Sequence, residues 1–352
     1  MSEKGLKNRN RKKITIIAAA ALLLVGMSFV CLFVGSSNMS ARDVLPALFG
    51  KGTAANVRIV RNIRVPRLLA AVIAGAGLSL SGLIMQTDLN NPMASPSTLG
   101  VSNAAVFGAN LSIIVFSGGF LSTGNNLSAF SVGADPFATS LTAFIFSTLS
   151  ILLILSLGKL RSFTPGTVVL SGIAVGAMWN AATTVLQFYA TDVGLSAAVI
   201  WNFGDLGRVT YKTDLIMLAV VLPCTIVFLL LSWRCNALLS GDATARSMGV
   251  NVDRLRFVSM LLSSLITAVC VSFLGVIGFV GIICPHTAKR LIGQDHRYSV
   301  PLSALLGSLL LVTADTLSRS LGSGSALPVG AVTSLLGAPF FVAIIFSRRL
   351  HH

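Results

Sequence analysis

The histidines and cysteines of this sequence, the residues best suited to metal binding or nucleophilic chemistry, do not occur at the spacings that such sites require. His351 and His352 end the chain, and His286 and His296 belong to no metal-binding pattern such as His-Glu-x-x-His. Five cysteines lie in or beside apolar stretches without a Cys-x-x-Cys pair, and we interpret them as packing residues; they are Cys31, Cys224, Cys235, Cys270 and Cys284. We find no convergent nucleophile, base or metal site, so we expect no enzyme activity, no bound metal and no cofactor in this chain.

The sequence also lacks the loop that holds nucleotide phosphates in many ATPases. It contains no Gly-x-x-x-x-Gly-Lys-[Ser/Thr] motif, whose backbone amides and lysine hold the phosphates. Any ATP hydrolysis that powers this protein is therefore expected in a separate subunit.

The composition is that of a membrane protein. The 352 residues are 54% hydrophobic and 11% charged, whereas soluble domains are about 25% charged. Apolar stretches of about 18 or more residues recur, and a bilayer core of roughly 30 Å takes about 20 helical residues to cross. Both observations predict an all-α integral membrane protein in contact with membrane lipid. The net charge of +15 lies mainly between apolar stretches, so we interpret it as a topology signal and expect no nucleic acid partner.

Breaks at Pro, Gly and charged residues divide the apolar sequence into about ten predicted spans within a single domain, residues 1–352. The stretch 258–292 is too long for one crossing, and Gly275, Gly278 and Gly281 permit a break inside it. The predicted spans are 14–35, 66–86, 98–117, 137–157, 166–189, 213–233, 258–275, 277–292, 300–318 and 329–347.

The charges around these spans predict the topology. A basic tail, residues 1–13, precedes an apolar stretch that runs from Ile14 to about Gly35. A secretory signal has an apolar core of about 7–15 residues, so this longer stretch predicts an uncleaved first span. With both termini in the cytoplasm, 17 of the 26 lysine and arginine residues fall on the cytoplasmic side, as the positive-inside rule expects.

One external segment departs from that rule. Six of the nine remaining basic residues crowd the first external segment, up to the start of the second span: Arg42, Lys51, Arg58, Arg61, Arg64 and Arg67. Such a concentration on the external side favours an acidic partner that docks there. A solvated loop that anchors the second span explains the charges equally well.

The cytoplasmic segment 234–257 between spans six and seven predicts a short capped helix. Ser240 or Asp242 can cap its start, residues 243–248 form about two turns, and Gly249 suits a left-handed stop. The segment is much longer than a minimal helix connection requires. We therefore interpret it as a docking surface, with an ordinary connecting helix as the alternative.

Ionisable residues inside the predicted spans are scarce. Asp315 is the clearest, and Arg319 follows four residues later on the same helix face. The two residues suit a structural pair near the membrane edge. A proton-coupled or sodium-coupled carrier usually needs more intramembrane carboxylates, so an ATP-independent secondary transporter is the weaker alternative function.

A series of short motifs from Arg64 to Phe341 covers most of the chain, and its order and spacing are far more specific than any one motif. In this series the chain resembles the permeases of iron-siderophore, haem and cobalamin ABC importers, the FecCD-type or type II family. The motifs are Arg64-Val65-Pro66-Arg67, Gly75, Gly82, Gln86, Asn91-Pro92-Met93-Ala94-Ser95-Pro96, Leu99-Gly100-Val101-Ser102, Trp201, Gly204, Gly241-Asp242 to Gly249, Gly278-Phe279-Val280-Gly281, Pro285-His286, Arg290, Gly293, Asp295-His296-Arg297, Pro301, Asp315, Arg319, Leu327-Pro328-Val329-Gly330 and Gly337-Ala338-Pro339-Phe340-Phe341.

The resemblance implies a type II importer permease bundle of ten spans in the bacterial cytoplasmic membrane. Such a subunit pairs into a dimer, for which we favour two identical copies, and works with an extracytoplasmic solute-binding protein and two ATP-binding cassette ATPase subunits that use ATP and magnesium. The resemblance assigns contact with the ATPase to Gly241, Asp242, Ala245, Arg246 and Gly249. It assigns docking of the binding protein to Arg64, Arg67 and Arg319.

Three positions depart from the family pattern. Ala326 replaces a glutamate that is common before the Leu-Pro-Val-Gly turn, Asn90 replaces a frequent arginine, and Ser95 stands where an acid is common. These departures affect loop contacts rather than the fold. The sequence does not identify the cargo, because no single residue type distinguishes haem, a siderophore and cobalamin.

Overall fold

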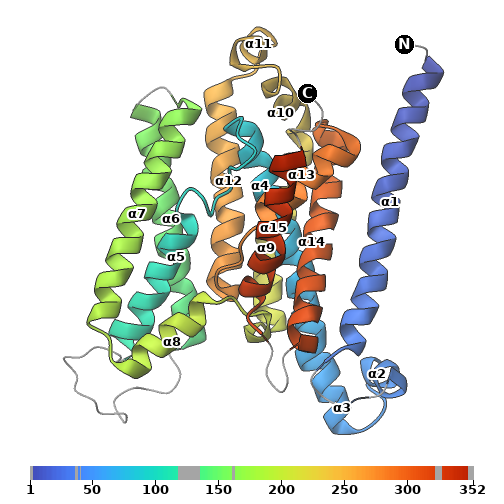
Figure 1. Cartoon of the computed structure of the whole chain (residues 1–352), viewed down its shortest axis with the longest axis vertical. Coiled ribbons are helices and arrows are strands. Elements are labelled where there is room, and N and C mark those ends of the chain that lie inside the picture. The colour runs from blue at the N-terminus through green and yellow to red at the C-terminus, as the bar shows by residue number, and fades with distance from the viewer. Residues whose placement is uncertain are drawn as a thin grey trace.

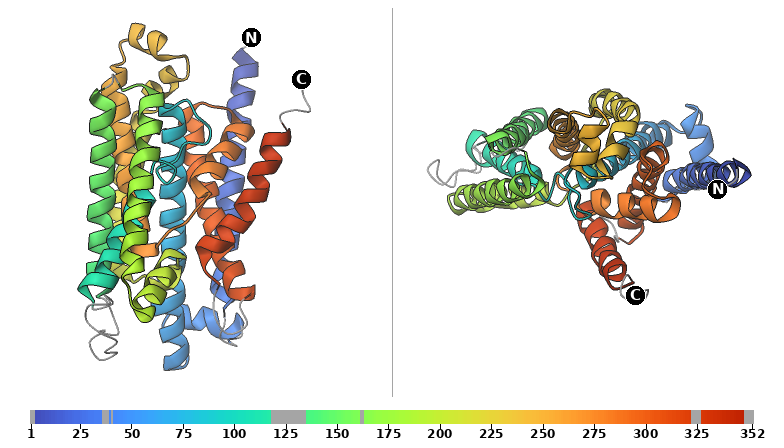
Figure 2. Two further views of the ribbon diagram at one scale, coloured as in Figure 1. Left: turned by 60° about the vertical axis from the view of Figure 1, so that its left-hand side comes forward. Right: turned by 90° about the horizontal axis from the view of Figure 1, so that it is seen from above.

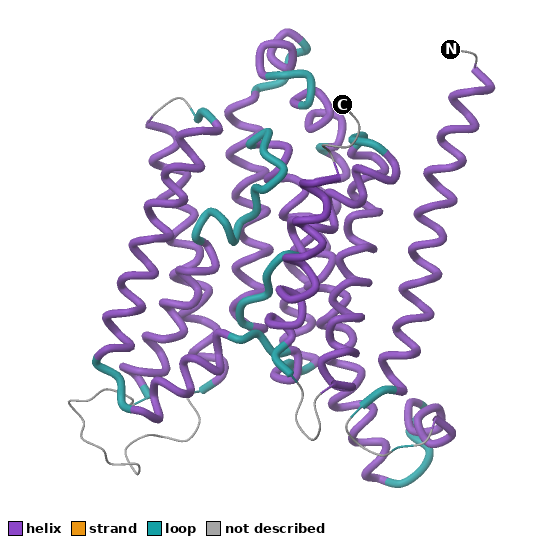
Figure 3. The backbone as a smooth tube through the Cα atoms, viewed as in Figure 1, coloured by secondary structure: helices purple, strands orange, loops and turns teal. Residues whose placement is uncertain are grey.

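The computed structural model describes residues 3–35, 39, 41–117, 135–160, 163–321 and 327–347, and within these ranges every regular element is a helix. Figures 1 and 3 show a bundle of long helices that run roughly side by side, with short helices at both ends. The predicted all-α membrane fold is therefore confirmed.

Each of the ten predicted spans contains a helix. Among the described residues, seven helical runs are long and apolar enough to cross a membrane; they include α1 (Glu3–Phe33), α4 (Val65–Asp88), α6 (Pro136–Leu160), α7 (Pro165–Phe188), α9 (Tyr211–Leu230), α12 (Val252–Leu274) and α14 (His296–Leu321). The other three predicted spans correspond to shorter helices: α5 (Val101–Asn110) with its continuation η2 (Leu111–Phe116), α13 (Val280–Ile292) and α15 (Val329–Ser347).

The long apolar stretch 258–292 is broken where its glycines permit. Helix α12 ends at Leu274, and Gly275 has a φ of +77°, a left-handed conformation that favours glycine. A β-carbon at Gly275 would lie 2.5 Å from the carbonyl oxygen of Trp201, so this position also has no room for a side chain. The chain resumes as α13 after Phe279, and the predicted pair of helices is confirmed.

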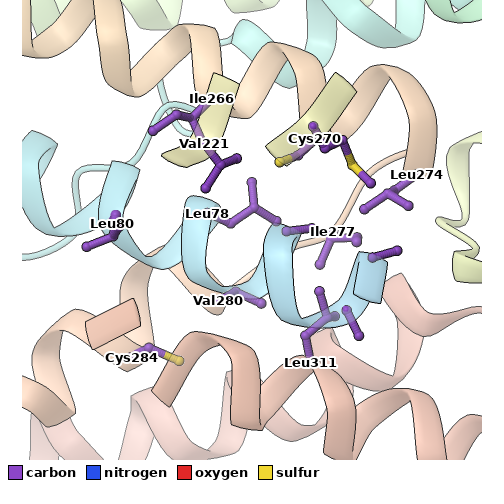
Figure 4. Close-up of a cluster of buried hydrophobic side chains, with 14 of the residues drawn as sticks. Leu78, Leu80, Val221, Ile266, Cys270, Leu274, Ile277, Val280, Cys284 and Leu311 are labelled. Atoms are coloured by element: carbon purple, nitrogen blue, oxygen red, sulfur yellow. The ribbon is translucent and has the colours of Figure 1, made fainter. Parts of the chain in front are cut away.

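Helix α4 lies at the centre of the bundle. It packs against α14, α12, α13 and α9, and Figure 4 shows its Leu78 and Leu80 among apolar side chains from these neighbours. Gly75 faces the backbone of Gly307 on α14, and Gly82 faces the backbone of Gly281 on α13, with no space for a β-carbon at either contact. Helices in lipid associate through such close packing, because the surrounding acyl chains are as apolar as the side chains.

Short helices gather at the two ends of the bundle. The N-terminal end of α1 lies at the same end as α10 (Ser232–Leu238) and α11 (Asp242–Ser247), as Figures 1 and 2 show. At the opposite end lie α2 (Ala41–Leu48), α3 (Ala54–Ile59), η1 (Val60–Arg64), α8 (Asp192–Asn202) and η4 (Leu206–Arg208). We call these the α11 end and the α8 end.

One helical run extends beyond the bundle at the α8 end. Helices α3, η1 and α4 are continuous over 35 residues, from Ala54 to Asp88. At 1.5 Å per residue this run is about 52 Å long, well above the roughly 30 Å of a bilayer core. Its first turns, which carry Arg58, Arg61 and Arg64 of the predicted basic segment, therefore project past the ends of the neighbouring helices.

The contact between α4 and α13 gives a first prediction. Gly82→Ala places a methyl group against the backbone of Gly281, which cannot rotate away as a flexible side chain can. Overpacking of this kind costs about 1–3 kcal/mol, so the detergent-solubilised protein should unfold at a clearly lower temperature. Gly26→Ala on α1, where nothing lies within 4 Å, is the matched control and should unfold as the wild type does. An unchanged unfolding temperature for Gly82→Ala would refute the close contact.

Candidate functional site

The predicted coupling segment forms a short helix at the α11 end, but its start is not capped as expected. Helix α11 follows Gly241, which has a φ of +96° and makes no side-chain capping hydrogen bond. The carboxylate of Asp242 instead accepts two hydrogen bonds from Arg256 on α12, both of 2.7 Å. The prediction that Ser240 or Asp242 caps this helix is therefore wrong, because a partner 14 residues away takes the carboxylate of Asp242.

Arg256 joins three helices at this end of the bundle. Its side chain is only 5% exposed. Besides Asp242, its Nε donates a 2.8 Å hydrogen bond to the carbonyl oxygen of Asp88, the last residue of α4. The hydroxyl of Ser259 on α12 also contacts the carboxylate of Asp88. Helix α11 is thus tied through one buried guanidinium to both α12 and the central helix α4.

The rest of the coupling segment divides into an inner and an outer face. Ala245 is fully buried and packs in a small apolar cluster with residues that include Val250 and Leu255. Arg246 points outward, with a side chain 57% exposed, and pairs at 3.1 Å with Asp253. Gly249 has a φ of +80°, which confirms the predicted left-handed stop. Met248 is 48% exposed and adds an apolar side chain to this surface, although it was not among the residues predicted to contact the ATPase.

At the α8 end, the three arginines predicted to dock a partner are buried. The Nε of Arg67 donates a 2.6 Å hydrogen bond to Oδ1 of Asp315 on α14. The Nε of Arg319 lies 3.1 Å from the other carboxylate oxygen, Oδ2. The predicted pair of Asp315 and Arg319 is therefore confirmed, and Arg67 is its third member. Arg64 donates to the carbonyl oxygens of Leu32 and Phe33 at 2.6 and 3.2 Å.

These arginines also complete the C-terminal end of α1. Arg319 donates from Nη1 to the carbonyl oxygen of Val34 at 2.6 Å and from Nη2 to that of Cys31 at 3.0 Å. The last carbonyls of a helix lack partners within it and carry partial negative charge. Arg64 and Arg319 supply both the missing donors and the opposite charge.

The basic side chains that face solvent lie next to this buried group. Arg42, Lys51, Arg58 and Arg61 are exposed. Arg58 and Arg61 line a surface hollow of about 750 Å³ together with Tyr211, whose hydroxyl donates to the carbonyl of Arg61. We call Lys51, Arg58 and Arg61 the basic rim. The sequence identified all three as part of a basic segment but did not separate them from the buried arginines.

The two internal histidines and the cysteines show no arrangement for metal chemistry. Among the described residues, no group of three or more His, Cys, Asp or Glu side chains is placed to hold a metal ion. His296 is fully buried, with Nδ1 2.8 Å from Asn236 Oδ1 and Nε2 2.9 Å from Thr87 Oγ1. This histidine therefore links α14 to α10 and α4.

Comparison with known proteins decides the family. A model of the FecCD transport family matches residues 22–347. The chain belongs to the FecCD transport family. The resemblance read from the sequence motifs is thus confirmed, and the chain is a transport permease subunit that crosses the membrane several times.

Relatives of this FecCD chain match it over nearly its whole length. A Methanocaldococcus jannaschii protein described as an ABC transporter permease is 42% identical, over 95% of each chain. The hemin transport system permease HmuU of Yersinia pestis is 38% identical, over 91% of this chain and 93% of its own. A solved structure described as an inward-facing conformation of a metal-chelate type ABC transporter matches with a TM-score of 0.80 and 28% identity, over 95% of this chain and 99% of the other.

Several FecCD motifs meet at one crossing point near the α8 end. The amide of Val329 donates to the carbonyl of Gly204 at 3.1 Å. A β-carbon at Gly204 or at Gly275 would lie 2.5 Å from a backbone carbonyl oxygen, which explains why glycine occupies both positions.

Two of the three positions that depart from the family pattern lie in described loops. Asn90 adopts a φ of +45° in the turn after α4, and the amide of Ser95 donates to the hydroxyl of Thr98. Ala326 lies outside the described residues.

The Arg256 junction gives a second prediction. Arg256→Gln removes both charged hydrogen bonds to Asp242, each worth about 1.5–3 kcal/mol where solvent is excluded. Because Asp242 is 44% exposed, we expect the loss to lie near the lower end of that range. A loss of about 1.5 kcal/mol makes local opening of α11 roughly tenfold more frequent, so its amides should exchange hydrogen about tenfold faster. Arg254→Gln, an exposed arginine on the same helix, is the control and should leave exchange in α11 unchanged. Equal exchange in the two variants would contradict the junction.

Proposed function

We propose that this chain is the membrane-spanning permease of an importer that carries an iron chelate, haem or cobalamin across the bacterial cytoplasmic membrane. The cargo follows from the family resemblance, and the hemin permease HmuU agrees with it. Transport proceeds by alternating access, driven by ATP hydrolysis with magnesium in separate ATPase subunits. The observation that carries this mechanism is the clamp of α11 by Arg256, which connects an exposed short helix to the centre of the bundle.

The exposed side of α11 suits a contact with the ATPase. Arg246 and Met248 offer a charged and an apolar group on one short helix, and Gly241 and Gly249 mark its two ends. Ala245 holds this helix to the bundle from within. A displacement of α11 by the ATPase acts on Asp242 and hence, through Arg256, on the last turn of α4. This is how a movement at the membrane surface reaches the packed helices.

The α11 end is the cytoplasmic end in this proposal. The basic start of α1 lies there, which agrees with the positive-inside distribution of the predicted topology. Both termini are then cytoplasmic, and the basic rim at the α8 end faces outward. A second copy of the permease completes the membrane part, and we favour a homodimer over a pair of related chains.

The outward face receives an acidic solute-binding protein. Lys51, Arg58 and Arg61 present charge directly to an approaching partner. The resemblance assigns docking to Arg64, Arg67 and Arg319, which in this conformation are engaged by Asp315 and by carbonyls of α1. We propose that the rim makes the first contact, and that carboxylates of the binding protein reach the three buried arginines only by competing with these internal acceptors.

An ATP-independent secondary transporter is less well supported. Asp315, the clearest ionisable residue in the predicted spans, is shared by two arginines and thus serves as a structural counter-ion. Uptake by this chain alone, in vesicles that lack nucleotide, ATPase and binding protein, would establish that alternative.

The third prediction concerns coupling. Arg246→Glu with Gly249→Val reverses an exposed charge and forces a β-branched residue into a left-handed conformation. In proteoliposomes that contain ATPase and binding protein, this double variant should retain ATP hydrolysis but lose at least tenfold in ATP-dependent uptake, measured with a panel of haem, siderophores and cobalamin. Lys159→Glu, an exposed change at the end of α6, should transport normally. Full uptake by the double variant would remove α11 from the coupling path.

The fourth prediction concerns docking. Arg58→Glu with Arg61→Glu reverses two exposed charges without touching the buried contacts of Arg64 and Arg67. Its affinity for the binding protein should fall at least tenfold at low salt, with a smaller difference at high salt because ions screen exposed charges. Arg254→Glu at the α11 end is the control, and docking of the same strength in both variants at low salt would exclude the rim.

A further inference from the structure

A crevice opens at the α8 end between two helices that both pack against α12. Its volume is about 630 Å³, and α6 and α9 form its sides above the last turns of α12. Six of its lining residues carry the argument: Phe137, Trp201, Arg208, Lys212, Ile216 and Phe273. None of them belongs to the coupling segment or to the basic rim.

The position of the crevice along the helices places it at the edge of the bilayer. Phe137 is the second residue of α6, Lys212 is the second residue of α9, and Phe273 is the last but one of α12. In a spanning bundle the helix ends lie where acyl chains give way to headgroups, and Trp, Lys and Arg side chains are enriched there. The crevice therefore lies at the depth of lipid phosphates and the first part of their chains.

The outer surfaces beside the crevice are lipid-facing in character. Leu141 and Ile145 continue along α6 with 48% and 50% exposure, and Leu215 and Leu222 along α9 with 66% and 51%. Apolar exposure on this scale is tolerated by a membrane helix because acyl chains cover it. A molecule that enters between α6 and α9 thus comes from the bilayer.

The lining combines an apolar wall with a cationic end. Phe137, Ile216 and Phe273 supply the apolar surface, and Arg208 and Lys212 supply two positive charges. Arg208 is held in place, because its Nη2 donates to the carbonyl of Ile200 at 2.8 Å. A guanidinium has five N–H donors, so others remain for a ligand. Lys212 is exposed at the mouth.

One carboxylate also lines the crevice and reduces this charge. Asp135 accepts a hydrogen bond of 3.1 Å from the amide of Phe137, so one of its oxygens is engaged at the start of α6. Within the lining, two cations face this one anion. Asp205 lies outside the lining and also acts on Arg208, but its carboxylate is shared with Arg67 at 3.7 Å. The lining itself therefore stays positive. Charge complementarity therefore favours a ligand whose headgroup carries net negative charge.

We propose that this crevice binds one anionic phospholipid, with its phosphate held by Arg208 and Lys212 and an acyl chain along Phe137, Ile216 and Phe273. The bound lipid also contacts Trp201 of α8. It thereby supports α8 and η4, the short elements that connect α7 to α9. This inference needs the membrane-spanning fold but depends on neither the cargo nor the ATPase, so it can fail or hold independently of the proposed transport function.

Trp201 provides a direct probe of the crevice. The chain has three tryptophans, so the double substitution Trp179→Phe with Trp233→Phe leaves Trp201 as the only one. This variant is titrated in detergent with brominated phosphatidylglycerol or brominated phosphatidylcholine, whose bromine atoms quench nearby tryptophan fluorescence. We expect the anionic lipid to quench Trp201 at an at least threefold lower mole fraction.

Substitutions of the two cations test the assignment. Arg208→Gln with Lys212→Gln should abolish the preference for phosphatidylglycerol. Lys212→Gln alone, an exposed change that should not affect folding, should reduce it. The matched control, Lys159→Gln with Arg254→Gln, removes two exposed charges elsewhere and should keep the full preference. Equal quenching by the two lipids, or a preference that survives in both crevice variants, would overturn the proposal.

Discussion

The close backbone contact of α4 with α14 and α13 is the constraint on which the rest of the structure depends. Membrane helices gain little from burying apolar side chains away from lipid, so their association depends on dispersion contacts and hydrogen bonds between helices. The glycine pairs Gly75 with Gly307 and Gly82 with Gly281 bring the backbones together. Hydroxyls then bridge the same interface, since Ser79 contacts Ser303 and Ser308 donates to the carbonyl of Val72. A helix fixed in this way on several sides moves as a rigid rod.

That rod connects the two ends of the molecule. Near its start, Arg67 binds Asp315 of α14, and at its last residue Asp88 receives Arg256 of α12. About 20 residues, or roughly 30 Å, separate these two junctions. Each junction uses a buried arginine, so breaking it would leave an uncompensated charge away from water. In the proposed mechanism, a shift of α11 is therefore transmitted along the helical run Ala54–Asp88, which also carries Arg64 and Arg67.

Much of the fold could be predicted from the sequence because the bilayer restricts the choices. Apolar length predicts the spans, and the glycines around residue 275 predict the break between α12 and α13. The side-chain partners could not be predicted in the same way. Asp242 fits an N-cap by local pattern, yet Arg256 takes its carboxylate from the next helix. Charge counting grouped Arg64 and Arg67 with the exposed basic residues of the first external segment, whereas only the folded chain shows that carbonyls of α1 and Asp315 surround them. The lipid crevice joins residues from segments far apart in the chain, and no local pattern marks it.

The charge balance of the three buried arginines, Arg64, Arg67 and Arg319, explains how α1 is attached to the bundle. This helix lies at the edge of the bundle, packs mainly on α14, and exposes most of its apolar surface. Three arginines gather at its C-terminal end, and the carboxylate of Asp315 neutralises only one of them, while Asp205 lies 3.7 Å from Arg67 and is 42% exposed. The remaining positive charge is stabilised by the carbonyls of Cys31, Leu32, Phe33 and Val34, which carry the negative end of the helix dipole. The arginines that give the outer face its buried positive charge are thus the same residues that attach the end of α1. Before these arginines can pair with carboxylates of a partner, they must break their hydrogen bonds to the end of α1. Docking on this face would therefore be linked to movement of the first span.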